Sequence, residues 1–240
     1  MIEVLAARAS WCAPEEKILW CHPLTSRGGT GKYIQYAVPG LNEFGEPRKL
    51  SRAALEAATG AASLFFEALL SQGETGETAS DSEVPWAVVA GKARDCLAVS
   101  HLADWQANGG NSAGFRDRKL FWVLTTHRLG LLDFTPRDSG EGSNSSGLLG
   151  GLKKTIGSVW DREEEQPANR ELELPVPLVC AEVPRNAIAS VEVVEQKVKG
   201  WKRNWFKVVL SDGSAFFISH RKHNEKRFFD RMLAMTYGQE

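Results

Sequence analysis

The 240-residue sequence lacks any run of about 18 consecutive apolar residues, so no segment is predicted to cross a bilayer as a helix. Its first nine residues include Glu3 and too short an apolar stretch for a secretory signal. It also lacks an excess of either charge, with 29 Lys and Arg against 30 Asp and Glu. We therefore expect a cytoplasmic protein whose contacts with polyanions, if it makes any, depend on a local basic patch.

Cysteine is scarce and irregularly placed. The four cysteines, Cys12, Cys21, Cys96 and Cys180, form no CxxC pair. Chains held together by disulfides are usually shorter and richer in cysteine. We expect these four side chains to be reduced and mostly buried.

Two stretches partly match motifs for phosphate binding or metal binding, and neither match is complete. Residues 27–32 (RGGTGK) resemble a phosphate-binding loop, but Ser26 stands where the first glycine is required. Tyr33 replaces the Ser or Thr that would bind Mg²⁺. His220 and His223 are three residues apart, with no carboxylate or Cys at ligand spacing. We predict a protein that is not an enzyme and that holds no metal or cofactor.

Residues 1–83 are predicted to form an N-terminal segment with one long amphipathic helix, from about 51 to 72. Short strands are expected at Lys17–Cys21 and Tyr33–Val38, and the polar stretch Gly73–Glu83 is expected to be a linker. The helix has one apolar face, made by Leu55, Ala58, Ala62, Phe65, Phe66 and Leu69.

Residues 84–240 are predicted to form a second, mainly β unit that ends in an amphipathic helix at about 224–237. We also expect a strand over Cys96–Leu102, although a helix fits that stretch almost as well. The clearest hairpin signal is Asp212-Gly213 between two apolar runs, because both residues tolerate positive φ. The expected strands are Leu120–Thr125, Leu129–Phe134, Leu178–Val183, Ala187–Val194, Phe206–Leu210 and Ala215–Ser219.

A long insertion, from about 135 to 170, interrupts this unit. Such a length without firm structural signals is usually functional or disordered. Within it lies a weakly amphipathic stretch that we interpret as a possible docking segment for a partner. Its candidate residues are Leu148, Leu149, Leu152, Lys153, Lys154, Ile156 and Trp160.

Three stretches of the second unit carry a family resemblance. The stretch FWVLTTHRLGLLDF (121–134) resembles a hairpin of bacterial PH-like and GRAM-like domains, with a Thr and an Arg at its turn. VPRNAIASVEVVE (183–195) and FKVVLSDGSAFFIS (206–219) are similar to that family's next strand and its penultimate hairpin. The resemblance implies an α+β protein: a PH/GRAM-like antiparallel β-barrel capped by its C-terminal helix, with the N-terminal segment and the loop insertion added.

Basic and aromatic residues gather in the predicted hairpin 197–207. Cations beside Trp suit an anionic lipid surface, and the same chemistry suits nucleic acid. The plainer interpretation is a solvated hairpin tip whose Trp packs back onto the sheet. The candidate ligand-binding or partner-binding residues are Lys197, Lys199, Trp201, Lys202, Arg203, Trp205 and Lys207.

From these observations we expect a non-catalytic binding module that recognises a protein partner or an anionic membrane surface. At a membrane it would act peripherally. One alternative, less favoured, is a nucleic-acid-associated factor that uses the 197–207 hairpin. Another is a structural subunit of an oligomer, in which the exposed Trp residues form the interface.

Overall fold

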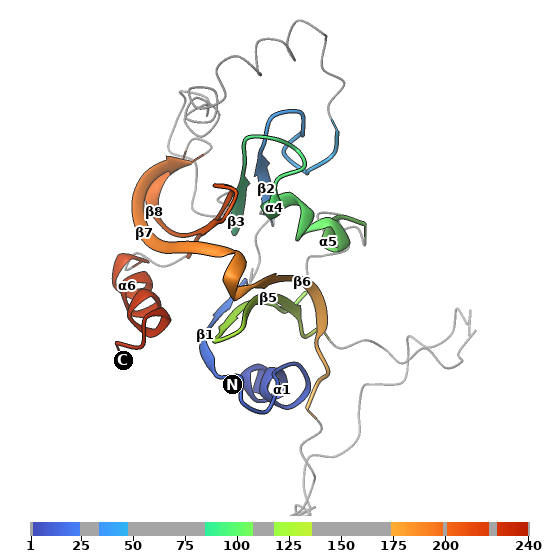
Figure 1. Cartoon of the computed structure of the whole chain (residues 1–240), viewed down its shortest axis with the longest axis vertical. Helices are drawn as coiled ribbons and strands as arrows, with labels where there is room; N and C mark the ends of the chain where they lie inside the picture. The colour runs from blue at the N-terminus through green and yellow to red at the C-terminus, as the bar shows by residue number, and fades with distance from the viewer. Residues whose placement is uncertain are drawn as a thin grey trace, which may run out of the picture.

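The computed structural model describes residues 2–24, 34–47, 85–107, 118–135, 174–198, 201–220 and 225–239, which form two β-sheets with short helices around them (Figure 1). The fold class is therefore α+β. Among these residues no helix is both long enough and apolar enough to cross a membrane. The predicted helix at about 51–72 and the linker that follows it lie outside the described residues.

Sheet A contains four antiparallel strands in the order β1-β4-β5-β6. Its central strands are apolar on both faces, because Trp122 enters the main core while Val123 contacts helix α1 on the other face. The run LFWVLT is therefore continuous rather than alternating. The elements of this half are α1 (Ile2–Ser10), β1 (Ile18–Pro23), β4 (Leu120–Thr125), β5 (Arg128–Asp133) and β6 (Leu178–Pro184).

Sheet B contains five strands in the order β2-β3-β9-β8-β7. The β2–β3 pair is parallel and all others are antiparallel. A parallel pair needs a crossover connection, and residues 38–86 supply it. The strands are β2 (Ile34–Ala37), β3 (Ala87–Ala90), β7 (Ile188–Val198), β8 (Trp201–Leu210) and β9 (Ala215–Ile218).

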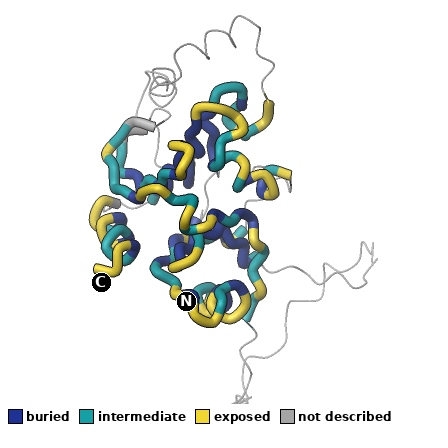
Figure 2. Tube along the Cα trace, in the orientation of Figure 1, coloured by how far each residue is buried: buried dark blue, intermediate teal, exposed yellow. Residues whose placement is uncertain are grey.

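The two sheets enclose one main hydrophobic core, seen as the buried interior in Figure 2. The chain passes from β6 to β7 through a 3-10 turn at Arg185–Ala187. Aromatic rings from both sheets meet in the core: Trp20 and Phe206 are 5.2 Å apart between ring centroids, and Trp122 and Phe216 are 5.5 Å apart. These contacts join the sheets, although they form no closed barrel among the described residues.

Helix α6 (Glu225–Thr236) lies against β1, β7 and β8. Its Phe229 is fully buried and its ring centroid is 5.8 Å from that of Phe206. The indole Nε1 of Trp20 donates a hydrogen bond to Thr236 Oγ1 at 2.8 Å. The prediction that the last amphipathic segment packs on the strands 206–219 is confirmed.

The predicted strand at Cys96–Leu102 is wrong, because this stretch contains helix α4 (Leu97–Ser100), which α5 (Ala103–Ala107) follows. The helix start is held by the distant β8–β9 turn: Leu97 N donates to Asp212 Oδ2 at 2.6 Å and Ala98 N to Ser214 Oγ at 3.1 Å. The alternation of Leu97 and Val99 gave no sign of these long-range partners.

Candidate functional site: the projecting β7–β8 hairpin

The β7–β8 hairpin is longer than its neighbour in sheet B. Strand β9 pairs with β8 only over Phe206–Val209. The β7–β8 ladder continues beyond that point, from Val194↔Trp205 to Val198↔Trp201 (β7 and β8 in Figure 1). The outer half of the hairpin, which we call the ribbon (residues 194–205), therefore extends past β9 as two strands.

Trp205 lies at the base of the ribbon and is fully buried. Its Nε1 donates to the carbonyl of Gln196 at 3.0 Å, and its ring meets Phe217 edge to face at 6.2 Å. Trp205 shares a small apolar cluster on sheet B with Val88 and Phe217. Trp205 thus packs back onto the sheet, as the plainer interpretation of this hairpin expects of its tryptophan.

Two of the predicted basic residues make contacts within the chain. Lys207 Nζ lies 2.6 Å from Glu192 Oε1 on the opposing strand and 5.7 Å from the centroid of Phe217. Arg203 Nη2 donates to the carbonyl of His220 at 2.8 Å. The Lys207 contact thus joins β8 to β7 below the ribbon, and the Arg203 bond ties the ribbon to the segment that follows β9.

Two further predicted residues, Lys197 and Lys202, are directly opposite each other on the ladder. The pair Val198↔Trp201 comes next and ends the ladder before the turn. Like charges that face each other across two strands destabilise the pairing, and a bound anion would relieve this repulsion. The structure describes only the backbone of Lys197, Trp201 and Lys202, and Lys199 lies outside the described residues.

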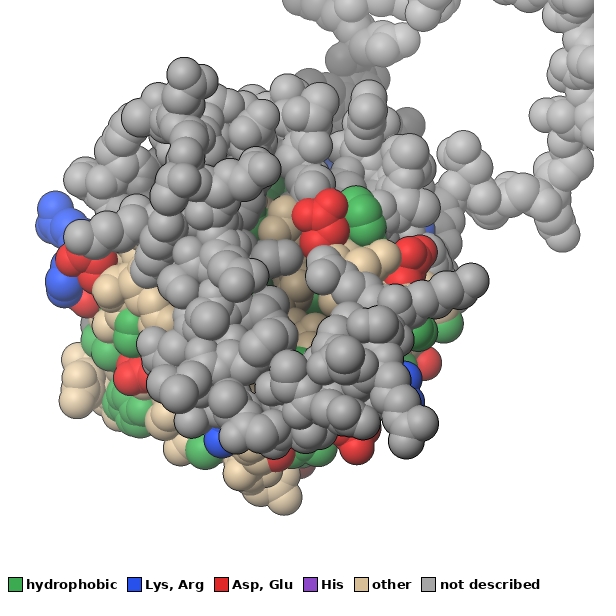
Figure 3. Space-filling view, turned by 90° about the horizontal axis from the view of Figure 1, so that it is seen from above, with side chains coloured by type: hydrophobic (Ala, Val, Ile, Leu, Met, Phe, Trp, Pro, Cys, Tyr) green, Lys and Arg blue, Asp and Glu red, His purple; other side chains and the backbone are tan. Residues whose placement is uncertain are grey.

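The other candidate region, the predicted docking segment within 148–160, also falls outside the described residues. On the face shown in Figure 3, acidic and basic side chains of the described residues lie interspersed. Strand pairing places Lys197 opposite Lys202 in a sequence with nearly equal numbers of basic and acidic residues.

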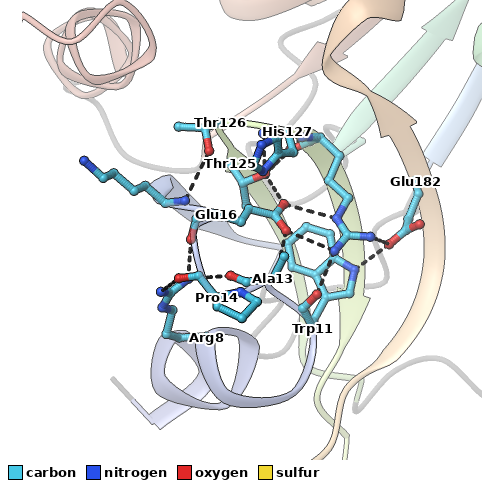
Figure 4. A network of polar contacts seen from close by, with 11 residues as sticks. Arg8, Trp11, Ala13, Pro14, Glu16, Thr125, Thr126, His127 and Glu182 are labelled. Carbon is cyan, nitrogen blue, oxygen red and sulfur yellow. Dashed lines mark hydrogen bonds and ion pairs between the residues drawn. The ribbon is translucent and has the colours of Figure 1, made fainter.

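A polar network surrounds the turn between β4 and β5 (Figure 4). Arg128 Nε and Nη2 donate to the two carboxylate oxygens of Glu16, each at 3.1 Å. Its Nη1 donates to Glu182 Oε1 at 3.0 Å and its Nη2 also donates to the carbonyl of Trp11 at 2.7 Å. The guanidinium carbon lies 4.6 Å from the centroid of the Trp11 indole.

Glu16 is the buried centre of this network, with 1% of its surface exposed. Burial alone would raise the pKa of its carboxyl, but hydrogen bonds from Thr125 and Arg128 bring the pKa below its ordinary value. The amide of Ala13 donates to the same carboxylate at 2.9 Å. The network binds residues 11–16 to the turn of sheet A. We assign it a structural role, because its carboxylate and guanidinium are directed at groups of the chain itself.

His22 in β1 is a second buried polar side chain, and it lies next to the residue that follows β9. Its Nε2 lies 3.0 Å from the carbonyl of Ser219, so this nitrogen carries the proton. Its Nδ1 has no hydrogen-bond partner among the described residues. The ring centroid is 5.3 Å from that of His220 and 5.5 Å from that of Phe228. Among the described residues, no group of three or more His, Cys, Asp or Glu could hold a metal ion.

The pKa of His22 is lowered to about 4, mainly by burial and to a smaller extent by the nearby His220, while the hydrogen bond to Ser219 opposes the shift. The buried, neutral imidazole of His22 therefore stabilises the folded protein fully above its unfolded pKa of about 6.5. This contribution to the free energy of unfolding is lost as the pH falls from there towards about 4. The unfolded chain takes up a proton in this range, whereas the folded chain does not.

We therefore expect acid to destabilise the protein through His22, by about 2 kcal/mol between pH 7.5 and pH 5. Urea unfolding at the two pH values measures this difference. His22→Gln removes the titrating group, so the difference should shrink by about that amount. His101→Gln, at a partly exposed histidine after α4, is the matched control. An unchanged pH dependence in His22→Gln would contradict the prediction.

One pattern was missed in the sequence. Residues 110–114 (GNSAG) match the G-x-S-x-G arrangement of a nucleophile elbow, which requires a strand before the serine and a helix after it. Among the described residues, the element before this stretch is the helix α5 and the one after it is the strand β4. The stretch itself and the residues directly around it, 108–117, lie outside the described residues.

Comparison of the chain with models of known families, with curated proteins and with solved structures finds no match.

Proposed function

We propose that this protein is a non-catalytic binding module of the PH-like or GRAM-like class, and that the end of its β7–β8 ribbon contacts an anionic membrane surface. Two observations support the class. The last strand of the four-stranded antiparallel sheet, β6, leads through a 3-10 turn into the meander β7-β8-β9. The chain then forms a helix that packs on β7 and β8. In this proposal α1, β2 and β3 are additions to the common framework.

The observation that carries the binding proposal is the position of Lys197 opposite Lys202 at the far end of the ribbon. Basic residues near an anionic leaflet each contribute about 1 kcal/mol, and Trp prefers the headgroup layer. Trp201 adjoins this pair on the ladder. Nucleic acid is less favoured, because Trp205 is buried against Phe217 and cannot stack on a base.

Flotation with phosphatidylcholine vesicles, with and without phosphatidylserine, tests this function. The protein should float only with the anionic lipid. The variant Lys197→Glu with Lys202→Glu should reduce the partition coefficient by about 30-fold or more, because two attractive charges become repulsive. Raising the salt concentration should weaken binding of the unaltered protein in the same direction.

The matched control is Lys92→Glu with Arg94→Glu, which makes the same charge change at two exposed residues between β3 and α4. Its binding should remain close to that of the unaltered protein. Equal losses in both double variants would show that only net charge matters. If the unaltered protein fails to float and the ribbon variant loses a protein partner in a pulldown, the ligand is that partner and not the lipid.

A further inference from the structure

The inner face of sheet A carries two buried polar atoms that accept or donate no hydrogen bond within the part of the chain that the structure describes. One is Nδ1 of His22 on β1, and the other is Nε1 of Trp122 on β4. Both side chains are buried, with 1% of His22 and 0% of Trp122 exposed. Such atoms are rare in folded proteins, because each gives up its hydrogen bonds to water without a replacement.

Strand pairing places these two residues next to each other. His22 and Trp122 are directly opposite on the β1–β4 ladder, so their side chains leave the same face of the sheet, with Cβ atoms about 5 Å apart. This face is directed at the main core. The Trp122 ring centroid lies 5.5 Å from that of Phe216 on β9, and the His22 centroid lies 6.3 Å from that of Phe229 on α6. The two atoms therefore share one part of the interior.

The two atoms are complementary in hydrogen bonding. Nε2 of His22 carries the ring proton, because it lies 3.0 Å from the carbonyl of Ser219, so Nδ1 can only accept. The indole Nε1 of Trp122 can only donate. This donor and this acceptor are not bonded to each other. One oxygen atom that bears a hydrogen would satisfy both, because it can accept from Trp122 and donate to His22 at the same time.

The surroundings restrict the group to which this oxygen belongs. The rings of His220 and Phe228 lie 5.3 Å and 5.5 Å from that of His22 between centroids. An ionised group would lose its hydration among these rings, which is costly unless an opposite charge compensates it. A ketone oxygen could accept from Trp122 but could not donate to His22. The site is thus suited to a neutral hydroxyl group.

We propose that His22 and Trp122 form an internal binding site for one neutral hydroxyl group. Two sources share this chemistry: a single water molecule, and the hydroxyl of a small apolar alcohol. Either one accepts from Trp122 Nε1 and donates to His22 Nδ1. Internal waters of globular proteins occupy polar positions of this kind, where they make about three hydrogen bonds each. This site is separate from the ribbon and does not depend on the function proposed above.

Nuclear magnetic resonance of the unaltered protein tests for water at this site. A water molecule held by Trp122 should give the indole Nε1 proton a cross peak to water. In a rotating-frame experiment this peak should have the sign opposite to the diagonal, which separates a close contact from hydrogen exchange. Trp122→Phe assigns the resonance, because it removes the indole N–H and keeps an aromatic ring.

Cyclohexanol and cyclohexanone test the second source. The two compounds have similar sizes and shapes, but only the alcohol can donate to His22. If the site takes an alcohol, cyclohexanol should raise the melting temperature above that measured with an equal concentration of cyclohexanone. It should also shift the Trp122 indole resonance, whereas a site that takes water alone should show the water cross peak and no difference between the two compounds.

His22→Asn and His22→Leu are the matched variants. Both lose the bond to Ser219, but Asn keeps an acceptor near the position of Nδ1 and Leu has none. The water cross peak, or the preference for the alcohol, should persist in His22→Asn and be lost in His22→Leu. Near-ultraviolet circular dichroism checks that each variant is folded.

Two results would overturn the proposal. One is an unaltered protein that shows neither the water cross peak nor a preference for cyclohexanol. This result decides the question even if no variant folds. The other is a folded His22→Leu protein that keeps the response of the unaltered protein, because Nδ1 would then play no part in it. Vesicle binding is a separate measurement, so this proposal and the proposed function can fail independently.

Discussion

Arg128→Ala is expected to lower the free energy of unfolding by about 3–5 kcal/mol, the range found when one partner of a buried ion pair is removed. The variant leaves the buried carboxylate of Glu16 without its two guanidinium hydrogen bonds. It also removes the contacts of Arg128 with Glu182 and with the Trp11 ring. Urea unfolding followed by Trp fluorescence measures the loss.

Two variants separate the network from a general effect of charge. Arg227→Ala removes an exposed arginine of α6 and should change stability by less than about 0.5 kcal/mol. Glu16→Gln with Arg128→Met removes both charges and should be less destabilised than Arg128→Ala, because no uncompensated charge remains buried. If Arg128→Ala were as mild as Arg227→Ala, the structural role assigned to this network would be wrong.

The strands and the last helix were predictable because their signals are local. The apolar runs of β4 and β5 flank a polar turn, and Asp212-Gly213 marks the β8–β9 hairpin with Gly213 at φ 80°. The amphipathic character predicted for α6 is confirmed, since Phe229 and Met232 are buried while Lys226, Arg227 and Asp230 are exposed. Each of these signals depends on neighbours a few residues apart, which is the range that periodicity and turn chemistry reach.

The contacts that organise the site were not predictable in the same way. Glu16 and Arg128 are 112 residues apart, and the start of α4 is held by Asp212 and Ser214. The parallel pairing of β2 with β3 joins two runs that the sequence separates by the predicted helix. Such pairings depend on the final packing, and hydrophobic patterns alone do not specify them. Closure of a barrel, which the family resemblance implies, also depends on long-range pairing and stays a prediction.

The two ends of the β7–β8 hairpin serve different purposes in our interpretation. At its base, Trp205 and Lys207 make internal contacts, and further along the ribbon Arg203 bonds to the carbonyl of His220. At its far end, Lys197 and Lys202 lie directly opposite each other on the ladder. The cluster that looked uniform in sequence is therefore divided by the fold, because alternate residues of a strand face opposite sides of the sheet.

Trp205→Ala should consequently act as a core mutation and lower the free energy of unfolding by about 3–5 kcal/mol. The side chain is fully buried, and truncation would leave a cavity beside Phe217 and release the indole bond to Gln196. Trp205→Phe keeps most of the apolar volume and should cost less. Urea unfolding ranks the three proteins.

The same pair of variants separates stability from binding at this hairpin. Trp205→Phe should retain vesicle binding under conditions in which it is folded, whereas Lys197→Glu with Lys202→Glu should lose binding and remain folded. Near-ultraviolet circular dichroism confirms the folded state of each. If Trp205→Ala changed stability little but abolished binding, Trp205 would belong to the ligand surface and the division of the ribbon would be wrong. A large loss of stability instead places this tryptophan in the core, where its contacts with β7 and β9 position the lysines.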